Sequence, residues 1–190
     1  MRLVADTGPL LALGMVDRLD LLPRLFSAVY IPTEVRRELE RGASKYRDAQ
    51  NALRSVLEGL LVEVPVEAGL MGEVERLMMG PPKLGRAQAE AIVLCRQLGI
   101  TLLLVDDLDA AKVAHRLGIK VIHGLDILVR SVEAGLLSSS EALSYIERFR
   151  RAGEYCKKDL RRAEKRLKRK EGRWHSEDWN KDFYERFKEP

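Results

Sequence analysis

Residues 101–128 have the sequence TLLLVDDLDAAKVAHRLGIKVIHGLDIL. The first five residues are apolar or β-branched without interruption, which is typical of a strand covered on both faces of a parallel sheet. Asp106 and Asp107 follow directly, and the pattern then predicts a helix over 108–117 and a short strand over 120–122. This strand–helix–strand succession predicts an α/β fold in which acidic residues follow a central strand.

The same alternation extends through the first 150 residues. We expect further strands at 2–5, 28–32 and 60–66, and further helices at 9–22, 33–41, 43–59, 69–79, 86–98, 124–133 and 138–151. Ser138 and Glu141 have the spacing of a capping box at the start of the last helix. The pattern predicts a mostly parallel sheet covered on both sides by helices.

Positive charge is concentrated at the end of the chain. The 190 residues have a net charge of +4, but residues 157–190 hold 13 Lys/Arg and 8 Asp/Glu, against 20 and 21 in the rest. We predict a domain at 1–153 and a helical basic extension at 154–190, beginning with an amphipathic helix at 157–170. The Trp, Tyr and Phe side chains of 174–190 are expected to dock on the body, a second subunit or a partner. A basic extension favours a polyanion partner, although a solvated helix face is the commoner meaning of a charge run.

Cysteine and hydropathy patterns exclude several classes of protein. Cys95 and Cys156 form no Cys-x-x-Cys pair, and with three histidines they are too few for a zinc module. Unpaired cysteines favour a reducing compartment, so we expect a cytoplasmic protein. Asp6 interrupts the apolar start early, which argues against a signal peptide, and no apolar run approaches the length of a membrane span.

Acidic residues fall where a parallel sheet brings them together. Asp6 follows the first strand, Asp106 and Asp107 follow a later one, and Glu38 and Glu90 lie early in helices that start at the same edge. Converging carboxylates repel one another unless some are protonated or a cation lies among them. Oxygen ligands suit Mg²⁺ or Mn²⁺, which promote phosphodiester hydrolysis without a His, Cys or Ser nucleophile.

Each acid has a structural alternative. Asp6 could cap the following helix, and Glu38 could pair with a neighbouring arginine. Glu90 is more informative, because its alanine neighbours indicate a buried helix face where an unpaired carboxylate is costly. The adjacent pair Asp106 and Asp107 after a buried strand points the same way. Together the acids favour a metal site.

Four stretches carry a resemblance to a known family: VADTGPLLAL (4–13), VYIPTEVRREL (29–39), LGRAQAEAI (84–92) and LLLVDDLDAAKVAHRLGIKVIHGLDIL (102–128). They resemble the PIN-domain family of metal-dependent ribonucleases, and more closely its branch of short prokaryotic proteins related to VapC-type toxins. The resemblance covers residues 1 to about 135. It implies a three-layer α/β/α sandwich, Mg²⁺ or Mn²⁺ as cofactor, and hydrolysis of single-stranded RNA.

The resemblance also implies roles for individual residues. The family's four acids fall on Asp6, Glu38, Glu90 and, in a register that stays open, Asp107 or Asp106. Asp6, Glu90 and the Asp106–Asp107 pair would hold the metal, while Glu38 would orient the metal or the attacking water.

Three further positions complete the expected site. Thr7 matches a hydroxyl position often found beside the first acid, and Lys83 and Arg86 are candidates for phosphate contacts. Many close relatives have Gly-Glu-Ala-Glu at 87–90, where this chain has Ala-Gln-Ala-Glu. That difference spares Glu90 and affects the loop before its helix.

Other classes fit less well or differ in activity. A HAD-type phosphatase needs an Asp where Gly8 stands, and a receiver domain needs a Lys after a late strand, whereas Lys120 opens its strand. A non-catalytic RNA- or protein-binding module that retains the metal site is the main alternative to an enzyme. If the protein is a toxin, its expected partners are RNA, a small antitoxin that plugs the acidic site, and a second copy in a homodimer.

Overall fold

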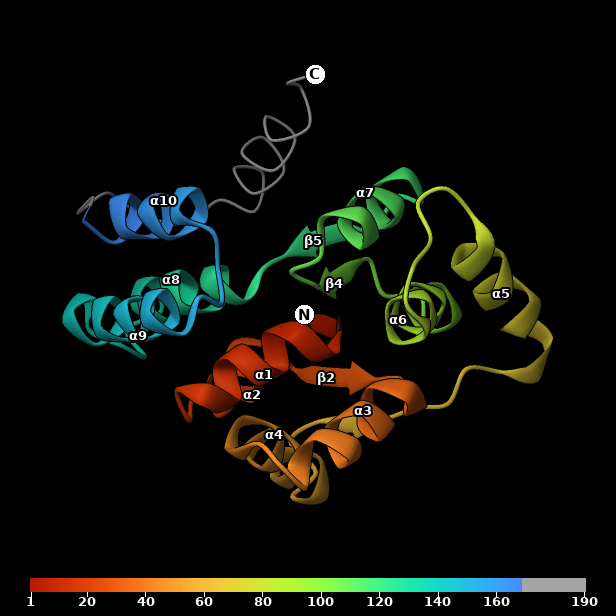
Figure 1. Ribbon diagram of the computed structural model, residues 1–190, viewed down its shortest axis with the longest axis horizontal. Helices are drawn as coiled ribbons and strands as arrows, with labels where there is room; N and C mark the ends of the chain where they lie inside the picture. Colours follow the sequence, from red (N-terminus) through yellow and green to blue (C-terminus); the bar gives the residue numbers. More distant parts are fainter. Residues whose placement is uncertain (169–190) are drawn as a thin grey trace. The chain divides into compact units, whose positions relative to one another are not determined.

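Five parallel strands form the sheet of residues 1–124 in the computed structural model, which describes residues 1–168 (Figure 1). The strands are β1 (Arg2–Ala5), β2 (Ala28–Ile31), β3 (Val62–Glu63), β4 (Leu102–Leu104) and β5 (Lys120–Ile122). Their order is β3-β2-β1-β4-β5, and every neighbouring pair is parallel. The chain moves outward from β1 in one direction and returns to its other side at β4. The carboxyl ends of β1 and β4 are therefore the switch point at which open α/β sheets bind ligands.

Helices cover both faces of this sheet, so the predicted three-layer α/β/α sandwich is confirmed. They are α1 (Thr7–Met15), α2 (Leu21–Leu25), α3 (Thr33–Ala43), α4 (Arg47–Leu57), α5 (Met71–Met79, preceded by the 3-10 turn η1, Ala68–Leu70), α6 (Arg86–Gln97) and α7 (Leu108–Arg116). Helix α6 packs on β1 and β4, the two strands of the switch point. Helix α1 packs on α4, and α7 packs on β5.

The core surrounds β1, β4 and α6. Leu3, Val4 and Ala5 are fully buried, as expected for a strand covered on both faces. Helix α6 is buried on most of its surface, between the sheet and neighbouring helices, and its small buried side chains, such as Ala89 and Ala91, allow close packing. Burial of this apolar surface is the main stabilising contribution, and it fixes the elements whose ends carry the acids.

Two predicted elements differ from the structure. The helix expected over 9–22 is two helices, because α1 ends at Met15 and Asp17 takes a left-handed φ of 57° before α2 begins. An Asp tolerates this conformation better than most residues, so no glycine marks the break. The strand expected over 60–66 is reduced to β3, which pairs with β2 through Tyr30 opposite Val62 and ends before Pro65.

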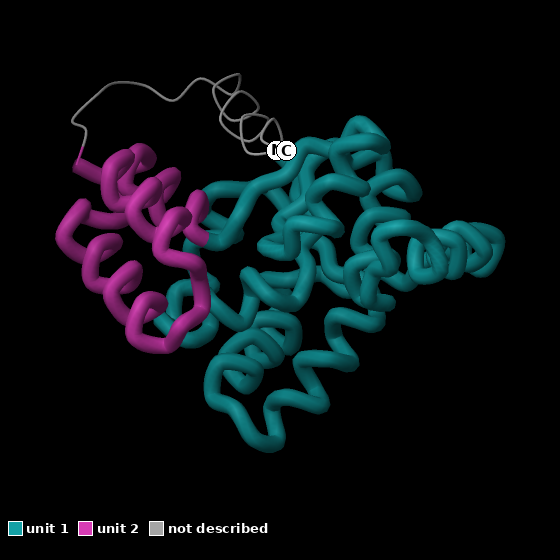
Figure 2. The backbone as a smooth tube through the Cα atoms, turned by 45° about the horizontal axis from the view of Figure 1, so that its top comes forward, with its two compact units in different colours: residues 1–124 teal, residues 125–190 magenta. Residues whose placement is uncertain are grey.

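The second compact unit comprises residues 125–190, of which 125–168 are described (Figure 2). It contains α8 (Gly124–Glu133), α9 (Ser139–Ala152) and α10 (Lys157–Lys168). The capping box is present, because the Ser138 amide donates to Glu141 Oε2 (2.8 Å) and the Glu141 amide donates to Ser138 Oγ (3.2 Å). The domain boundary at Gly153 stays a prediction, and the aromatic residues of 174–190 lie outside the described residues. No described helix is long and apolar enough to cross a bilayer.

Candidate metal centre

Asp6 lies at the switch point, directly after β1. Its backbone amide donates a hydrogen bond to the carbonyl of Leu104 in β4 (2.9 Å), which fixes its position between the two central strands. The side chain is 6% exposed, and it does not cap α1. Among the described residues, its Oδ1 is the only fully buried side-chain oxygen or nitrogen without a hydrogen-bond partner. The capping role considered for Asp6 is therefore absent, and a buried carboxylate oxygen is left without a donor.

The surroundings of Asp6 disfavour its charged form. Burial is the largest effect and, together with the nearby carboxylates of Glu38, Asp106 and Asp107, it raises the pKa of Asp6 to about 7, while the Thr7 backbone amide opposes the shift. The structure thus brings Asp6, Glu38, Asp106 and Asp107 within electrostatic reach of one another. A group in this state gains most from a bound cation or a proton.

Asp106 and Asp107 follow β4 but have different environments. Asp107 is exposed and caps α7, because its Oδ1 accepts a hydrogen bond from the Ala110 amide (2.8 Å). Asp106 is half-buried, and its Oδ1 accepts a hydrogen bond from the Gly124 amide (2.9 Å). Asp107 therefore has a helix-capping role, whereas Asp106 is held by the segment that follows β5.

His123 is a residue that the sequence analysis did not single out. It follows β5 directly, it is 7% exposed, and its Nδ1 lies 3.5 Å from Asp106 Oδ1. Its position in the sequence could have indicated a place at the site, because a polar residue that follows a third parallel strand reaches the same sheet edge as Asp6 and Asp106. His123 and the Gly124 amide together orient the Asp106 carboxylate.

Glu38 approaches the site from α3. It is half-buried, and the Thr7 hydroxyl donates a hydrogen bond to its Oε2. Thr7 is the first residue of α1 and the neighbour of Asp6, so this bond connects α3 to the switch point. The arginine pairing considered for Glu38 is absent, because Arg36 and Arg41 pair with other glutamates.

Glu90 lies on α6 and is 5% exposed. Its Oε2 accepts a hydrogen bond from the Glu34 amide in the first turn of α3 (3.1 Å), and its Oε1 accepts one from Arg86 Nε (3.1 Å). A carboxylate at a helix N-terminus is favourable because the helix dipole places partial positive charge there. Glu90 is thus linked to α3, one turn from Glu38, and not directly to Asp6.

The two basic candidates and the Gln88 difference occupy the start of α6. Arg86 forms the ion pair with Glu90, while Lys83 is exposed, and no polar contact of the described residues joins it to the acids. Gln88 Oε1 accepts a hydrogen bond from the Gly85 amide (2.9 Å), closing the first turn of the helix. Gln88 thus supplies the same acceptor oxygen that a Glu at this position would supply, so a Gln here preserves the turn.

The donor set suits a hard divalent cation. Every candidate ligand is a carboxylate, and Asp6 offers a buried oxygen without a donor beside three like charges. Within residues 1–168, no three His, Cys, Asp or Glu side chains are grouped closely enough to hold a metal ion. Glu38 and Glu90 both accept hydrogen bonds from protein donors. The residues present fit Mg²⁺ or Mn²⁺ by chemistry and by the unmet electrostatic requirement of Asp6.

A family model described as a PIN domain matches residues 2–171, a span that includes all of the acids discussed above. No curated protein and no solved structure matches the chain.

Proposed function

The chain belongs to the PIN-domain family, and on that premise we propose that it is a metal-dependent endoribonuclease that hydrolyses single-stranded RNA. PIN domains are generally nucleases that act on RNA, and they typically use divalent metals. The observation that carries the proposal is Asp6, whose buried oxygen has no donor while three carboxylates surround it electrostatically. This arrangement is unfavourable in a merely structural site and favourable around a cation.

Some of the acids would hold a metal ion, and Glu38 would position the attacking water. Asp6, Glu90 and the Asp106–Asp107 pair would hold Mg²⁺ or Mn²⁺, and the half-buried position of Asp106 supports it over Asp107 as the ligand. When bound, such an ion supplies Lewis-acid stabilisation of the charge that develops on phosphate oxygens. Glu38, held by the Thr7 hydroxyl, would accept a hydrogen bond from the attacking water and orient it.

The reaction is an in-line hydrolysis. The water oxygen forms a bond to phosphorus, the bond from phosphorus to the 3′ oxygen breaks, and that oxygen takes up a proton. The products are a 5′-phosphate and a 3′-hydroxyl. Lys83 and Arg86 are the proposed phosphate contacts, and Arg86 would have to leave Glu90 to make one.

The first experiment is cleavage of end-labelled single-stranded RNA with Mn²⁺, Mg²⁺ or EDTA. Wild type, Asp6→Asn and a control, Asp109→Asn, are compared. Asp109 is exposed and pairs with Lys112 on the surface of α7, so its substitution removes a nearby carboxylate outside the site. We expect metal-dependent cutting by wild type and by the control, and none by Asp6→Asn. Undiminished cutting by Asp6→Asn contradicts the proposal.

A non-catalytic RNA- or protein-binding module that retains the metal site is the second candidate. It is favoured by the engagement of Glu38 and Glu90 with protein donors. Binding of Mn²⁺ in calorimetry without RNA cleavage by the wild type would support this alternative. Both candidates therefore predict that the protein binds Mn²⁺, and they differ in whether it cleaves RNA.

The biological setting is also a proposal. We propose a cytoplasmic toxin of the VapC-like branch, with a small antitoxin that covers the acidic site and with a homodimer as the functional state. Expression of wild type in a bacterial host should arrest growth, and expression of Asp6→Asn should not. Equal growth of the two strains would favour an RNA-processing role over that of a toxin.

A further inference from the structure

Helix α10 has an inner face fixed within the second unit. Leu160, Ala163 and Leu167 are buried, and the helix packs on α9. Arg166 Nη1 lies 2.8 Å from Asp126 Oδ1 of α8, and Glu164 pairs with Arg150 of α9. The apolar and ion-pairing residues therefore hold α10 in one orientation in its unit.

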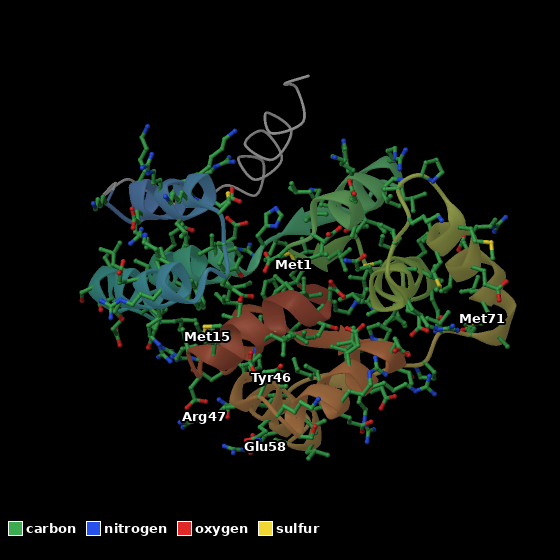
Figure 3. All side chains as sticks on the ribbon, viewed as in Figure 1. Met1, Met15, Tyr46, Arg47, Glu58 and Met71 are labelled. Atoms are coloured by element: carbon green, nitrogen blue, oxygen red, sulfur yellow. The ribbon has the colours of Figure 1, made fainter. Side chains whose placement is uncertain are left out.

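The opposite face of α10 carries positive charge alone. Five residues on it are exposed: Lys157, Lys158, Arg161, Lys165 and Lys168, here named the basic stripe. With about 3.6 residues per turn, these five positions fall within an arc of about 100° and span about 16 Å along the axis. Figure 3 shows nitrogen-ended side chains projecting from α10 on the side away from α9.

The basic stripe differs from the charged surface of α3. On α3, exposed arginines are neutralised by glutamates, as in the pairs of Arg36 with Glu40 and of Arg41 with Glu34. Among residues 1–168, no acidic side chain pairs with any of the five stripe residues. The two acids of α10, Asp159 and Glu164, lie outside the stripe, where they contact Cys156 and Arg150 respectively. The exposed arginines of α3 are salt-bridged, whereas the stripe residues have no acidic partner among residues 1–168.

We propose that the basic stripe binds the phosphate backbone of single-stranded RNA. The inference rests on the proposed function, because it takes RNA as the polyanion that this chain meets. The apolar face of α10 is buried in the protein, so the helix lacks the exposed apolar side with which basic amphipathic helices enter membranes. A row of four lysines and one arginine supplies positive charge and no base-specific group of its own, so the stripe adds affinity regardless of sequence.

The salt dependence of RNA binding measures how many phosphates the basic stripe neutralises. For single strands, the slope of log affinity against log salt changes by about 0.7 for each phosphate neutralised. Removal of all five charges should therefore flatten that slope by as much as about 3.5 and weaken binding at low salt by at least about tenfold. Contacts from uncharged side chains to bases would leave the slope unchanged.

The test compares two variants of equal charge, both in an Asp6→Asn background with EDTA so that RNA stays intact. The stripe variant combines Lys157→Gln, Lys158→Gln, Arg161→Gln, Lys165→Gln and Lys168→Gln. The control variant combines Lys45→Gln, Arg47→Gln, Arg54→Gln, Arg116→Gln and Lys120→Gln, which are exposed cations of the first unit, one of them labelled in Figure 3. Fluorescence anisotropy of a labelled oligouridylate is measured between about 50 and 200 mM salt.

We expect the stripe variant to bind the RNA more weakly and with a smaller slope of log affinity against log salt. The control variant should stay close to the Asp6→Asn parent in both quantities. Equal losses in the two variants would show a general charge effect and overturn the proposal. If thermal unfolding shows that the stripe variant is unfolded, the double variant Lys158→Gln/Lys165→Gln replaces it, with an expected slope change of about 1.4. Binding to phosphatidylserine vesicles in the absence of RNA binding would also overturn it.

The cleavage assay and the RNA-binding assay distinguish the nuclease proposal from the proposal that the basic stripe binds RNA. RNA cleavage by the wild type with unchanged binding by the stripe variant would leave the nuclease proposal standing and refute the stripe. Absence of cleavage with loss of salt-dependent binding in the stripe variant would refute the nuclease proposal and support the stripe.

Discussion

The hydroxyl of Thr7 donates a hydrogen bond to a carboxylate oxygen of Glu38 and so joins the first residue of α1 to the middle of α3. Thr7 adjoins Asp6, whose pKa is raised in part by Glu38. The hydroxyl thus fixes where a second carboxylate stands beside the most perturbed acid of the site. This contact gives Thr7 a positioning role that does not require it to touch substrate.

Replacing Thr7 by Val removes the hydroxyl and keeps the shape of the side chain. We expect RNA cleavage to fall by about 10- to 100-fold, the usual cost of losing a residue that orients a ligand, with an unchanged unfolding temperature. Thr7→Ser keeps the donor and should retain most activity. The double variant Thr7→Val/Glu38→Gln should be no slower than Glu38→Gln alone, because the two residues act together. Additive losses in the double variant would contradict the positioning role.

The raised pKa of Asp6 makes the stability of the metal-free protein depend on pH. The folded protein keeps the Asp6 proton up to about pH 7, whereas the unfolded chain loses it near 3.8. Between these values the unfolded state binds fewer protons, so the free energy of unfolding falls as pH rises, by an amount on the order of 4 kcal/mol. Asp6→Asn removes this pH-dependent loss of stability, because an amide does not titrate.

Thermal unfolding in EDTA at pH 5 and pH 8 measures the effect. We expect wild type to be less stable than Asp6→Asn at pH 8 and the two to converge toward pH 5. Mn²⁺ at pH 8 should stabilise wild type and leave Asp6→Asn unchanged. A variant that is no more stable than wild type in EDTA at pH 8 would show that the burial of Asp6 carries no electrostatic cost.

Much of the fold can be predicted from local sequence, because the clearest apolar patterns belong to the most buried strands and helices. The apolar run before Asp106 forms β4, and a parallel sheet then requires Asp6 and Asp106 to share an edge. The break at Asp17 is not evident from the sequence, since residues 16–20, between α1 and α2, contain no Gly or Pro. β3 is an edge strand, so few neighbours constrain its length.

The acids could be predicted, but their partners could not. Hydrogen bonds from Thr7 to Glu38 and from the Glu34 amide to Glu90 depend on how α3 lies against α1 and α6, which is a tertiary property. The capping role of Asp107 is local, and the residue type allowed it, yet the neighbouring Asp106 fits the same sequence rule. The structure separates the two because only Asp106 contacts the Gly124 amide.

Asp107 can be tested for capping and for catalysis separately. Asp107→Asn keeps a good capping side chain and removes the charge, whereas Asp107→Ala removes both. We expect Asp107→Ala alone to lose about 1 kcal/mol of unfolding free energy in urea titrations. If Asp107 holds the metal, both variants lose cleavage; if Asp106 is the ligand, Asp107→Asn stays active and Asp106→Asn does not. Equal stability of Asp107→Ala and wild type would contradict the capping role.

Arg86 occupies one oxygen of Glu90, so it competes with any cation that needs that carboxylate. Arg86→Gln leaves a nearly buried carboxylate with one donor fewer, and we expect the metal-free variant to lose about 1 to 3 kcal/mol of stability. Because the competing charge is gone, Mn²⁺ should raise the unfolding temperature of Arg86→Gln more than that of wild type. Arg96→Gln is the matched control, since Arg96 lies on the same helix and pairs with Glu73 outside the acidic site. The same response to Mn²⁺ in all three proteins would mean that Glu90 takes no part in metal binding.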